Sequence, residues 1–378
     1  MIFSSDQTSR KTIIRNSVLF ALCVLFAFFI RSAICEREVS REKILTGNDF
    51  APFQVESAMM YSYVNAVADG KSIAGVDSGL VGMNEYTVAE QMSLGLEYYL
   101  GWGIRTKRLL LNTPAIDPKN SACENNPADT AQMRSLLRFW VCFIPGFIFL
   151  WLIFAGCPWP LAIFGAALYA VAPAAVARYT GQDLLKGEFG LPFLVAAFAF
   201  AQFSANRKTI AGLSLTGLAI FCATAFWDAP QLCIGLWGVL EILRLAAKGE
   251  VSANRRHLFI TVYVAMALSA VLIPYNRAHA FILSPVILAV WPTLIALSFL
   301  HFNNLKKRFA GIIVVCLFFA VIWQTISSNS RFAGNYSHFS SLTAAKLKFF
   351  NVKPENPTQL NFEQRFLWTP SLDSATLP

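Results

Sequence analysis

The sequence predicts an all-α, polytopic membrane protein with about nine transmembrane helices and one large exterior loop after the first span. Three observations carry this prediction. Apolar residues make up 56% of the chain and charged residues only 14%, against roughly 25% charged residues in soluble domains. The apolar residues gather in runs close to the roughly 20 residues that a helix needs to cross a bilayer. Lys and Arg cluster on every second connection between these runs, as the positive-inside rule requires.

The same composition argues against several functions. The net charge is +9, but the bases lie in short groups between apolar runs, so nucleic acid is not an expected partner. The sequence holds no glycine-rich phosphate loop, no His-Glu-x-x-His helix and no Cys-x-x-Cys pair. Most cysteines lie inside apolar runs, where each acts as a small hydrophobic residue. Cys35 and Cys123 share one polar segment, and a disulfide between them remains open if that segment is exported.

The amino end predicts a first span that stays attached. Residues 1–16 are polar and basic, and residues 17–30 form an apolar run. Because the bases precede the run, we expect a cytoplasmic amino terminus and a first transmembrane helix. A cleaved signal peptide is the alternative. Ser32-Ala33-Ile34 is a poor cleavage site and further spans follow, so we favour an uncleaved helix.

Residues 31–136 form the long polar region that we assign to an exterior loop with the first acidic motif. A helix is expected over 53–67, and glycines then mark loops. The apolar stretch 92–111 is expected to be a helix that lies on the surface, since three bases near its end make it a poor span. Residues 112–130 are rich in Asn, Pro and Asp and predict a loop.

Residues 137–327 are a ladder of apolar runs that predicts a bundle of transmembrane helices. The expected spans are 139–156, 159–176, 189–205, 209–226, 231–247, 258–274, 280–300 and 309–327.

The basic connections set the topology of this bundle. Basic groups at 207–208, 248–256 and 306–308 mark the cytoplasmic side. The segments on the opposite, exterior side are then 31–136, 178–188, 227–230, 275–279 and the tail 328–378. Few charges lie in the middle of a span, which argues against a transporter or a proton relay.

Acidic residues on the exterior side are the candidates for chemistry. Glu56 begins a helix-like run, where it acts either as a helix cap or as a ligand. Residues 178–188 form a polar island between two apolar runs, which is either a solvated loop or a site. Asp183 and Glu188 lie in this island. Carboxylates from two exterior loops could converge on one Mg²⁺ or Mn²⁺, with a diphosphate supplying further ligands.

Two further exterior segments carry charge. Arg277 lies beside His279 in the segment Tyr275-Asn276-Arg277-Ala278-His279, where an Arg either pairs with a phosphate or anchors the helix at the interface. Residues 362–370 of the tail mix aromatic side chains with Glu363 and one Arg, as an exterior loop in contact with substrate would.

The run from Ala167 to Gly181, followed by acids and then by a span, resembles the exit of the third span in the catalytic subunits of oligosaccharyltransferases. These are membrane glycosyltransferases of the GT-C class. Their first acidic motif follows the first span, as Glu56 does here. The resemblance covers the topology of the whole chain, and at the level of residues it is confined to 167–190 and, loosely, 49–70.

The resemblance implies a GT-C-like fold and transfer of a sugar or oligosaccharide from a polyprenyl-(di)phosphate donor at the exterior face. The acceptor would be a protein, a lipid or a glycan. A divalent cation would be held by Glu56, Asp183 and Glu188, which would also be the catalytic residues, and would neutralise the departing phosphate. Arg178 would meet the lipid phosphate, and Glu363 is a distant counterpart of an acid at the acceptor site. We expect a bacterial inner membrane, with the site facing the periplasm.

The sequence also departs from the family pattern. The family has Asp where this chain has Glu56, and the acids of its second motif are separated by one residue, whereas Asp183 and Glu188 are five apart. The carboxyl-terminal half that reads a peptide acceptor in the family is absent. The chain is therefore a fragment, a short relative or one part of a split system. A catalytically inactive membrane scaffold and a transporter or flippase for lipid-linked substrates remain as alternative functions.

Overall fold

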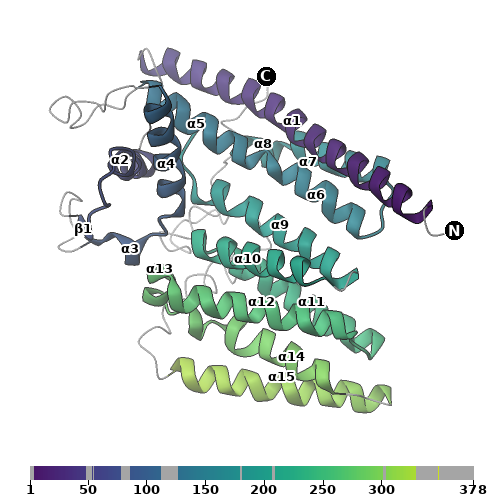
Figure 1. Ribbon diagram of the computed structural model, residues 1–378. Helices are drawn as coiled ribbons and strands as arrows, with labels where there is room; N and C mark the ends of the chain where they lie inside the picture. The colour runs from purple at the N-terminus through teal and green to yellow at the C-terminus, as the bar shows by residue number, and fades with distance from the viewer. Residues whose placement is uncertain are drawn as a thin grey trace.

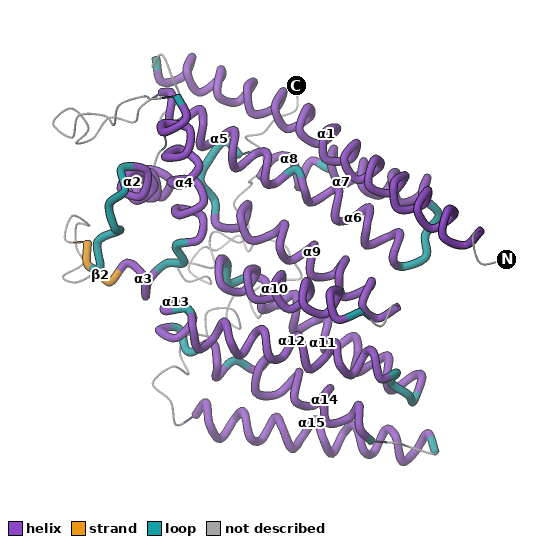
Figure 2. The backbone as a smooth tube through the Cα atoms, viewed as in Figure 1, coloured by secondary structure: helices purple, strands orange, loops and turns teal. Residues whose placement is uncertain are grey.

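The computed structural model describes residues 4–47, 53, 55–77, 86–111, 127–178, 181–206, 209–300, 304–328 and 348. Most of these residues are helical (Figure 2). The long helices lie side by side in one body, with α1 (Ser4–Thr46) along one edge and α15 (Leu305–Ser328) along the opposite edge (Figure 1).

Shorter elements cover one end of this body, on the left in Figure 1. They are α2 (Val55–Ala68), β1 (Val76–Asp77), β2 (Tyr86–Thr87), α3 (Val88–Gln91) and α4 (Gly95–Leu110). The two short strands pair antiparallel, with Val76 opposite Thr87. The helices expected over 53–67 and 92–111 are thus confirmed as α2 and α4.

The remaining elements form the bundle. They are α5 (Pro127–Val141), α6 (Phe143–Phe154), α7 (Trp159–Val171), α8 (Pro173–Arg178), α9 (Lys186–Asn206), α10 (Ile210–Phe226), α11 (Pro230–Lys248), α12 (Ala253–Leu272), α13 (Pro274–Ala278), η1 (Phe281–Leu283), η2 (Val286–Val290) and α14 (Trp291–Phe299). A helix or helical segment lies over each predicted apolar run.

The lengths and compositions of the helices agree with a polytopic membrane protein. In the described part of the chain, six helical segments are long and apolar enough to cross a membrane. They are Lys11–Leu45, Pro127–Phe154, Lys186–Asn206, Pro230–Lys248, Ala253–Leu272 and Lys306–Ile326. Three shorter apolar helices are Trp159–Val171, Ile210–Phe226 and Val286–Phe299. The all-α membrane class is supported, and the number of nine spans stays a prediction.

The first helix is much longer than the apolar run 17–30 that predicted it. It continues through Arg31, whose side chain is fully buried and donates to the Ala175 carbonyl at 3.2 Å. The helix can therefore continue beyond this buried charge, because the bundle supplies a hydrogen-bond acceptor for the guanidinium. Cys35 lies further along the same helix as a buried, free thiol. Cys123 lies outside the described residues, so the open disulfide between them gains no support.

The run 280–300 does not form one regular helix. A short 3-10 turn, η1, and a π-helical turn, η2, precede α14. Pro285 and Pro292 interrupt the backbone hydrogen-bond ladder here, and a π turn is a common way to absorb such a break.

Small residues let the central helices approach closely. α9 carries four buried alanines on its packed side, Ala196, Ala197, Ala199 and Ala201, and it packs against α6 and α10. In a bilayer, where both lipid and side chains are apolar, helices associate through such close packing rather than by excluding water. α9 is the central helix of the bundle, and its amino-terminal end therefore has a fixed position.

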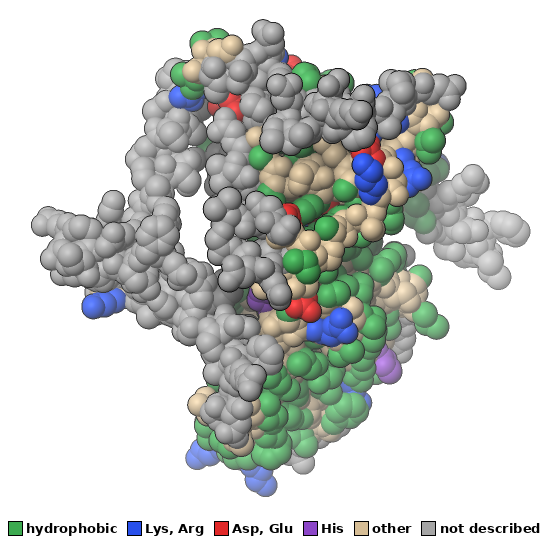
Figure 3. Space-filling view, turned by 90° about the vertical axis from the view of Figure 1, so that its left-hand side faces the viewer, with side chains coloured by type: hydrophobic (Ala, Val, Ile, Leu, Met, Phe, Trp, Pro, Cys, Tyr) green, Lys and Arg blue, Asp and Glu red, His purple; other side chains and the backbone are tan. Residues whose placement is uncertain are grey.

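The end that carries α2 to α4 is chemically mixed. Figure 3 views this end directly, and acidic and basic side chains lie near the middle of the face while hydrophobic side chains fill its lower part. Charged side chains thus reach the surface at this end of the body.

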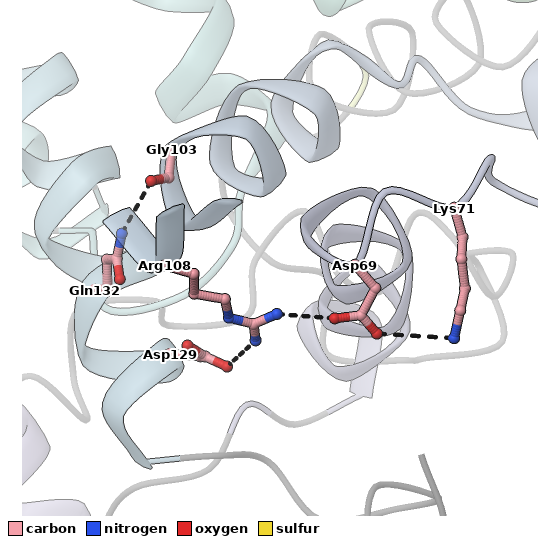
Figure 4. Close-up of polar contacts among 6 residues, drawn as sticks. All are labelled: Asp69, Lys71, Gly103, Arg108, Asp129 and Gln132. Carbon is pink, nitrogen blue, oxygen red and sulfur yellow. Dashed lines mark hydrogen bonds and ion pairs between the residues drawn. The ribbon is translucent and has the colours of Figure 1, made fainter. Parts of the chain in front are cut away.

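One arginine ties the elements of this end together (Figure 4). Arg108 of α4 donates to Asp69, just after α2, at 2.8 Å and to Asp129 of α5 at 2.7 Å. Its side chain is 13% exposed. A guanidinium with two carboxylates at such distances is a strong, directional link. It holds α2 and α4 against the beginning of the α5–α6 segment.

Candidate functional site

A pocket opens at the end of the bundle that α2 to α4 cover. Its volume is about 170 Å³. Its walls come from α2, α3, the start of α9, the α10–α11 turn and α13. The lining residues are Met59, Met60, Gln91, Met92, Ser93, Lys186, Trp227, Asp228 and Tyr275. These walls belong to four of the segments that the basic connections predicted to share one exterior side.

One wall of the pocket carries Lys186, which is paired with a buried acid. The ammonium of Lys186, the first residue of α9, lies 2.6 Å from a carboxylate oxygen of Glu97 and also donates to the carbonyl of Ser93. Glu97 is fully buried, whereas the Lys186 side chain keeps 17% of its exposure. Glu97 lies in the first turn of α4, where the helix dipole favours a negative charge. The pair therefore fixes the lysine at the pocket surface.

The environment of Glu97 opposes its ionisation. Burial raises the pKa of Glu97, and the Lys186 ammonium beside it offsets part of that shift. Its second carboxylate oxygen is buried with no hydrogen-bond partner among the described residues. A buried acid with one unsatisfied oxygen is costly, so the pair with Lys186 is the contact that makes this position tolerable.

The turn between α10 and α11 forms another wall, through Trp227 and Asp228. The Ser93 hydroxyl donates to the Phe226 carbonyl at 2.8 Å. Gly190 of α9 lies directly under Trp227, because a Cβ added at Gly190 would be 2.6 Å from the Cβ of Trp227. The half-buried Asp228 follows at once on the same turn. Its position on the pocket wall is thus set by contacts on both sides of the turn.

The third wall begins at Tyr275 in α13. The ring of Tyr275 packs against the ring of His279, with centroids 4.2 Å apart. The next residue, Asn276, is fully buried and donates to the Thr224 carbonyl at 3.0 Å and to the Ser269 hydroxyl at 2.8 Å. These bonds fix α13 against α10 and α12. The predicted phosphate ligand, Arg277, is exposed and does not line the pocket.

Glu188 has a structural partner in the loop that precedes α9. Its side chain is 1% exposed, and its Oε1 accepts the backbone N–H of Gly181 at 3.2 Å. Gly181 has φ of +75°, a conformation that favours glycine. A Cβ there would also be 2.8 Å from the backbone nitrogen of Arg138. Glu188 therefore closes the loop 181–188 over α5.

Asp183 lies in the same loop in a different environment. Its side chain is exposed, unlike that of Glu188. Desolvation by the surrounding protein raises the pKa of Asp183, and the nearby Arg134 opposes the shift. Arg134 itself donates to the Gln182 carbonyl at 2.8 Å, and the Ser57 hydroxyl of α2 accepts the Leu184 N–H at 3.1 Å. The loop is thus fastened to both α5 and α2.

The other predicted site residues are described only in part. Glu56 is the second residue of α2 and Arg178 the last residue of α8, but the side chains of both lie outside the described residues. Glu363 lies outside them entirely. The contact between Ser57 and Leu184 brings the start of α2 next to the loop 181–188. The structure thus brings the backbones of the two predicted acidic segments together.

The described side chains do not by themselves form the predicted cation site. Among them, no group of three or more His, Cys, Asp and Glu residues is arranged to hold a metal ion. One oxygen of Glu188 is engaged by Gly181, and Asp183 is exposed. The site predicted from Glu56, Asp183 and Glu188 stays a prediction, because it depends on the undescribed side chain of Glu56.

The sequence alone assigned no catalytic or binding role to Lys186 and Asp228 of the pocket, or to Glu97, which pairs with Lys186. Lys186 lies within the polar island, where Arg178, Asp183 and Glu188 were the residues predicted to have a role. Asp228 stands in a short exterior turn between two apolar runs, and Glu97 is the acid in a surface helix. The signal available for Asp228 and Glu97 is a charge within a largely apolar stretch. The meeting of the three residues depends on contacts between residues far apart in the chain.

No protein-family model matches this chain, and no curated protein is similar to it.

Proposed function

We propose that this protein is a membrane glycosyltransferase that moves a sugar or oligosaccharide from a polyprenyl-(di)phosphate donor to a protein, lipid or glycan acceptor, in a bacterial inner membrane with the pocket facing the periplasm. The observation that carries the proposal is the pocket that both Lys186 and Asp228 line. A cation and a carboxylate at one water-accessible site, beside helices of membrane-spanning length, suit a reaction between a membrane-held phosphate and a hydroxyl group.

The size of the pocket limits what enters it. Its volume of about 170 Å³ is below the roughly 300–1,000 Å³ of pockets that enclose a whole drug-sized ligand. The pocket therefore takes the sugar–phosphate junction of the donor, and the hydrophobic chain stays outside in the lipid. This division agrees with the residues that line the pocket, which come from the first residue of α9, the α10–α11 turn and α13.

The two charged residues have complementary roles in the proposed transfer. The acceptor hydroxyl oxygen forms a bond to the anomeric carbon, and the bond from that carbon to the phosphate oxygen breaks. Asp228 accepts the proton of the hydroxyl as general base. The lipid phosphate leaves with the electron pair, and Lys186 stabilises its charge. Glu97 is a positioning residue, since it holds the ammonium of Lys186 at 2.6 Å.

Turnover of a labelled polyprenyl-linked sugar in membranes tests these roles. We expect Asp228→Asn to lower the rate by roughly 10²- to 10⁴-fold, the usual contribution of a general base, and Lys186→Met to lower it as well. Glu90→Gln is the matched control, because Glu90 is an exposed acid of α3 that does not line the pocket. A rate that Asp228→Asn leaves unchanged, with loss in Asp183→Asn and Glu56→Gln, would contradict the pocket and favour the acidic motifs.

The predicted Mg²⁺ or Mn²⁺ is examined in the same assay. Removal of divalent cations with a chelator, followed by return of either ion, shows whether turnover depends on a metal. If it does, Glu56→Gln should weaken the response to the ion, because Glu56 is the residue on which the predicted site depends. The roles of Lys186 and Asp228 do not require this ion.

A catalytically inactive scaffold is the second candidate function. The environment of Glu188, an acid of the second acidic motif, favours this function. Its side chain accepts the Gly181 N–H and so closes a loop. A motif whose acid serves the fold is expected in a relative that has kept the architecture without the chemistry. The native chain would then turn over none of a panel of polyprenyl mono- and diphosphate sugars, and Asp228→Asn would not change its assembly or its abundance.

A further inference from the structure

A second, larger cavity opens on the side of the bundle. Its volume is about 470 Å³, and it lies between α6, α9, α11 and the start of α12. Aromatic rings of Trp151, Phe198 and Trp237 form its walls. The Trp151 and Phe198 rings are stacked with centroids 5.7 Å apart, and the Trp237 ring meets Phe198 edge-on at 5.6 Å. The small side chains of Ala201 and Ala205 leave the space between these walls open.

One end of this groove is charged. An Nη atom of Arg255 donates to both carboxylate oxygens of Glu241, at 2.7 and 2.6 Å. Arg244 lies 3.9 Å from the same carboxylate, and its side chain is 40% exposed. Two guanidinium groups and one carboxylate leave one net positive charge. Because Glu241 is already engaged by Arg255, the exposed Arg244 is available to a second anion.

The charged end lies on the side that the basic connections mark. Arg244 is in the last turn but one of α11, close to Lys248, and Arg255 is in the first turn of α12. Along α11 the groove runs from Arg244 to Cys233, which at about 1.5 Å per residue is about 16 Å. That length is close to half of the roughly 30 Å hydrocarbon core. The groove therefore has the depth of one leaflet.

We propose that this groove binds one acyl chain of an anionic phospholipid, drawn from the leaflet on the side of the basic connections, with the phosphate on Arg244. The apolar, aromatic walls fit a hydrocarbon chain, and the net positive charge at the mouth fits an anionic headgroup. The volume of about 470 Å³ is within the roughly 300–1,000 Å³ range of specific ligand pockets. This site is independent of the proposed glycosyl transfer.

The geometry separates this lipid from two other occupants. A transmembrane helix of a partner is about 10–12 Å wide with its side chains, and it would cross both leaflets, whereas the groove has the depth of one. The polyprenyl donor would have to carry its phosphate to the pocket that Lys186 lines, at the opposite end of the bundle from Arg244. A phosphate seated on Arg244 therefore belongs to a different molecule.

Quenching of tryptophan fluorescence by brominated lipids tests the proposal with the full chain. The protein is reconstituted in phosphatidylcholine vesicles with rising fractions of brominated phosphatidylglycerol or, separately, brominated phosphatidylcholine. The difference between the native chain and Trp237→Phe gives the fluorescence of Trp237. We expect this fluorescence to be half quenched at a lower fraction of brominated phosphatidylglycerol than of brominated phosphatidylcholine. Arg244→Gln should raise the fraction needed for half quenching by roughly fivefold, the effect of one basic residue near a membrane surface.

Lys248→Gln is the matched control, because it removes an equal charge from the last turn of α11 without lining the groove. It should leave half quenching of the Trp237 component near its native value. Equal quenching by both lipids would show ordinary boundary lipid and overturn the proposal. Equal shifts in Arg244→Gln and Lys248→Gln would reduce it to general surface charge. Displacement of brominated phosphatidylglycerol by a polyprenyl phosphate would assign the groove to the donor and overturn it too.

Discussion

At the scale of single residues, the two acids of the polar island have different environments. Glu188 is 1% exposed and receives a backbone N–H, whereas Asp183 is exposed beside Arg134. The sequence places Glu188 just before an apolar run, and α9, which begins at Lys186, includes it in its first turn. The sequence could not predict the partners of the two acids, because Gly181 meets Glu188 only through a turn with a positive φ, and Arg134 comes from another helix.

Asp183 gives a prediction about pH. Its pKa is raised in the fold by desolvation, so the folded state disfavours the charged form. The protonated Asp183 side chain therefore stabilises the fold at a pH below its unfolded pKa of about 3.9. This stabilisation is lost as the pH rises through the pKa of Asp183 in the folded state. We therefore expect Asp183→Asn to melt at a higher temperature than the native chain at pH 7, with the difference shrinking toward pH 4, as measured in detergent by thermal unfolding.

Asp129→Asn should change stability in the opposite direction. Asp129 accepts from Arg108 at 2.7 Å in the native chain, and loss of a hydrogen bond to a charged group costs about 1.5–3 kcal/mol. Its melting temperature should therefore fall at pH 7. A lower melting temperature for Asp183→Asn at pH 7 would show instead that the Asp183 carboxylate is stabilised by Arg134.

At the scale of elements, apolar runs predicted the positions of the bundle helices well, because a run of that length has few other stable structures in a bilayer. They predicted the ends of helices less well. α1 continues to Thr46 because Ala175 and the bundle accept the charge of Arg31. The segment 280–300 breaks into three pieces around its prolines. Both differences depend on tertiary packing that no single run contains.

The contact between α9 and the α10–α11 turn gives the prediction at this scale. Gly190→Ala would place a Cβ 2.6 Å from that of Trp227, so the turn that carries Asp228 must move. Overpacking of this kind typically costs about 1–3 kcal/mol, and displacement of Asp228, the proposed general base, should lower turnover further. Gly217→Ala is the control, because its new methyl would meet only the Thr261 side chain, at 3.1 Å, away from the pocket. Equal turnover in the two variants would contradict the role of the turn.

At the scale of the whole molecule, the fold separates the two cavities for which ligands are proposed. The pocket of Lys186 and Asp228 lies at the end covered by α2 to α4, and the lateral groove opens toward the end where α11 finishes and α12 begins. The alternation of basic connections predicted these two ends from sequence, since it depends on charge counting alone. It could not predict either cavity, because each is lined by at least four segments that only the packed bundle brings together.

The sidedness of the two ends gives the last prediction. Lys71, just after α2, and Lys248, at the end of α11, are both exposed and lie at opposite ends of the body. The test uses a chain in which the eight native cysteines are replaced. We expect Lys71→Cys to react with a membrane-impermeant maleimide in cells whose outer membrane is permeabilised and whose inner membrane is intact. Lys248→Cys should react only after the inner membrane is opened, because Lys248 belongs to a basic connection. Labelling of both positions from one side would contradict the assigned topology, and the reverse pattern would move the proposed transfer site to the cytoplasm. In either case the charge pattern would then reflect binding to an anionic surface rather than orientation.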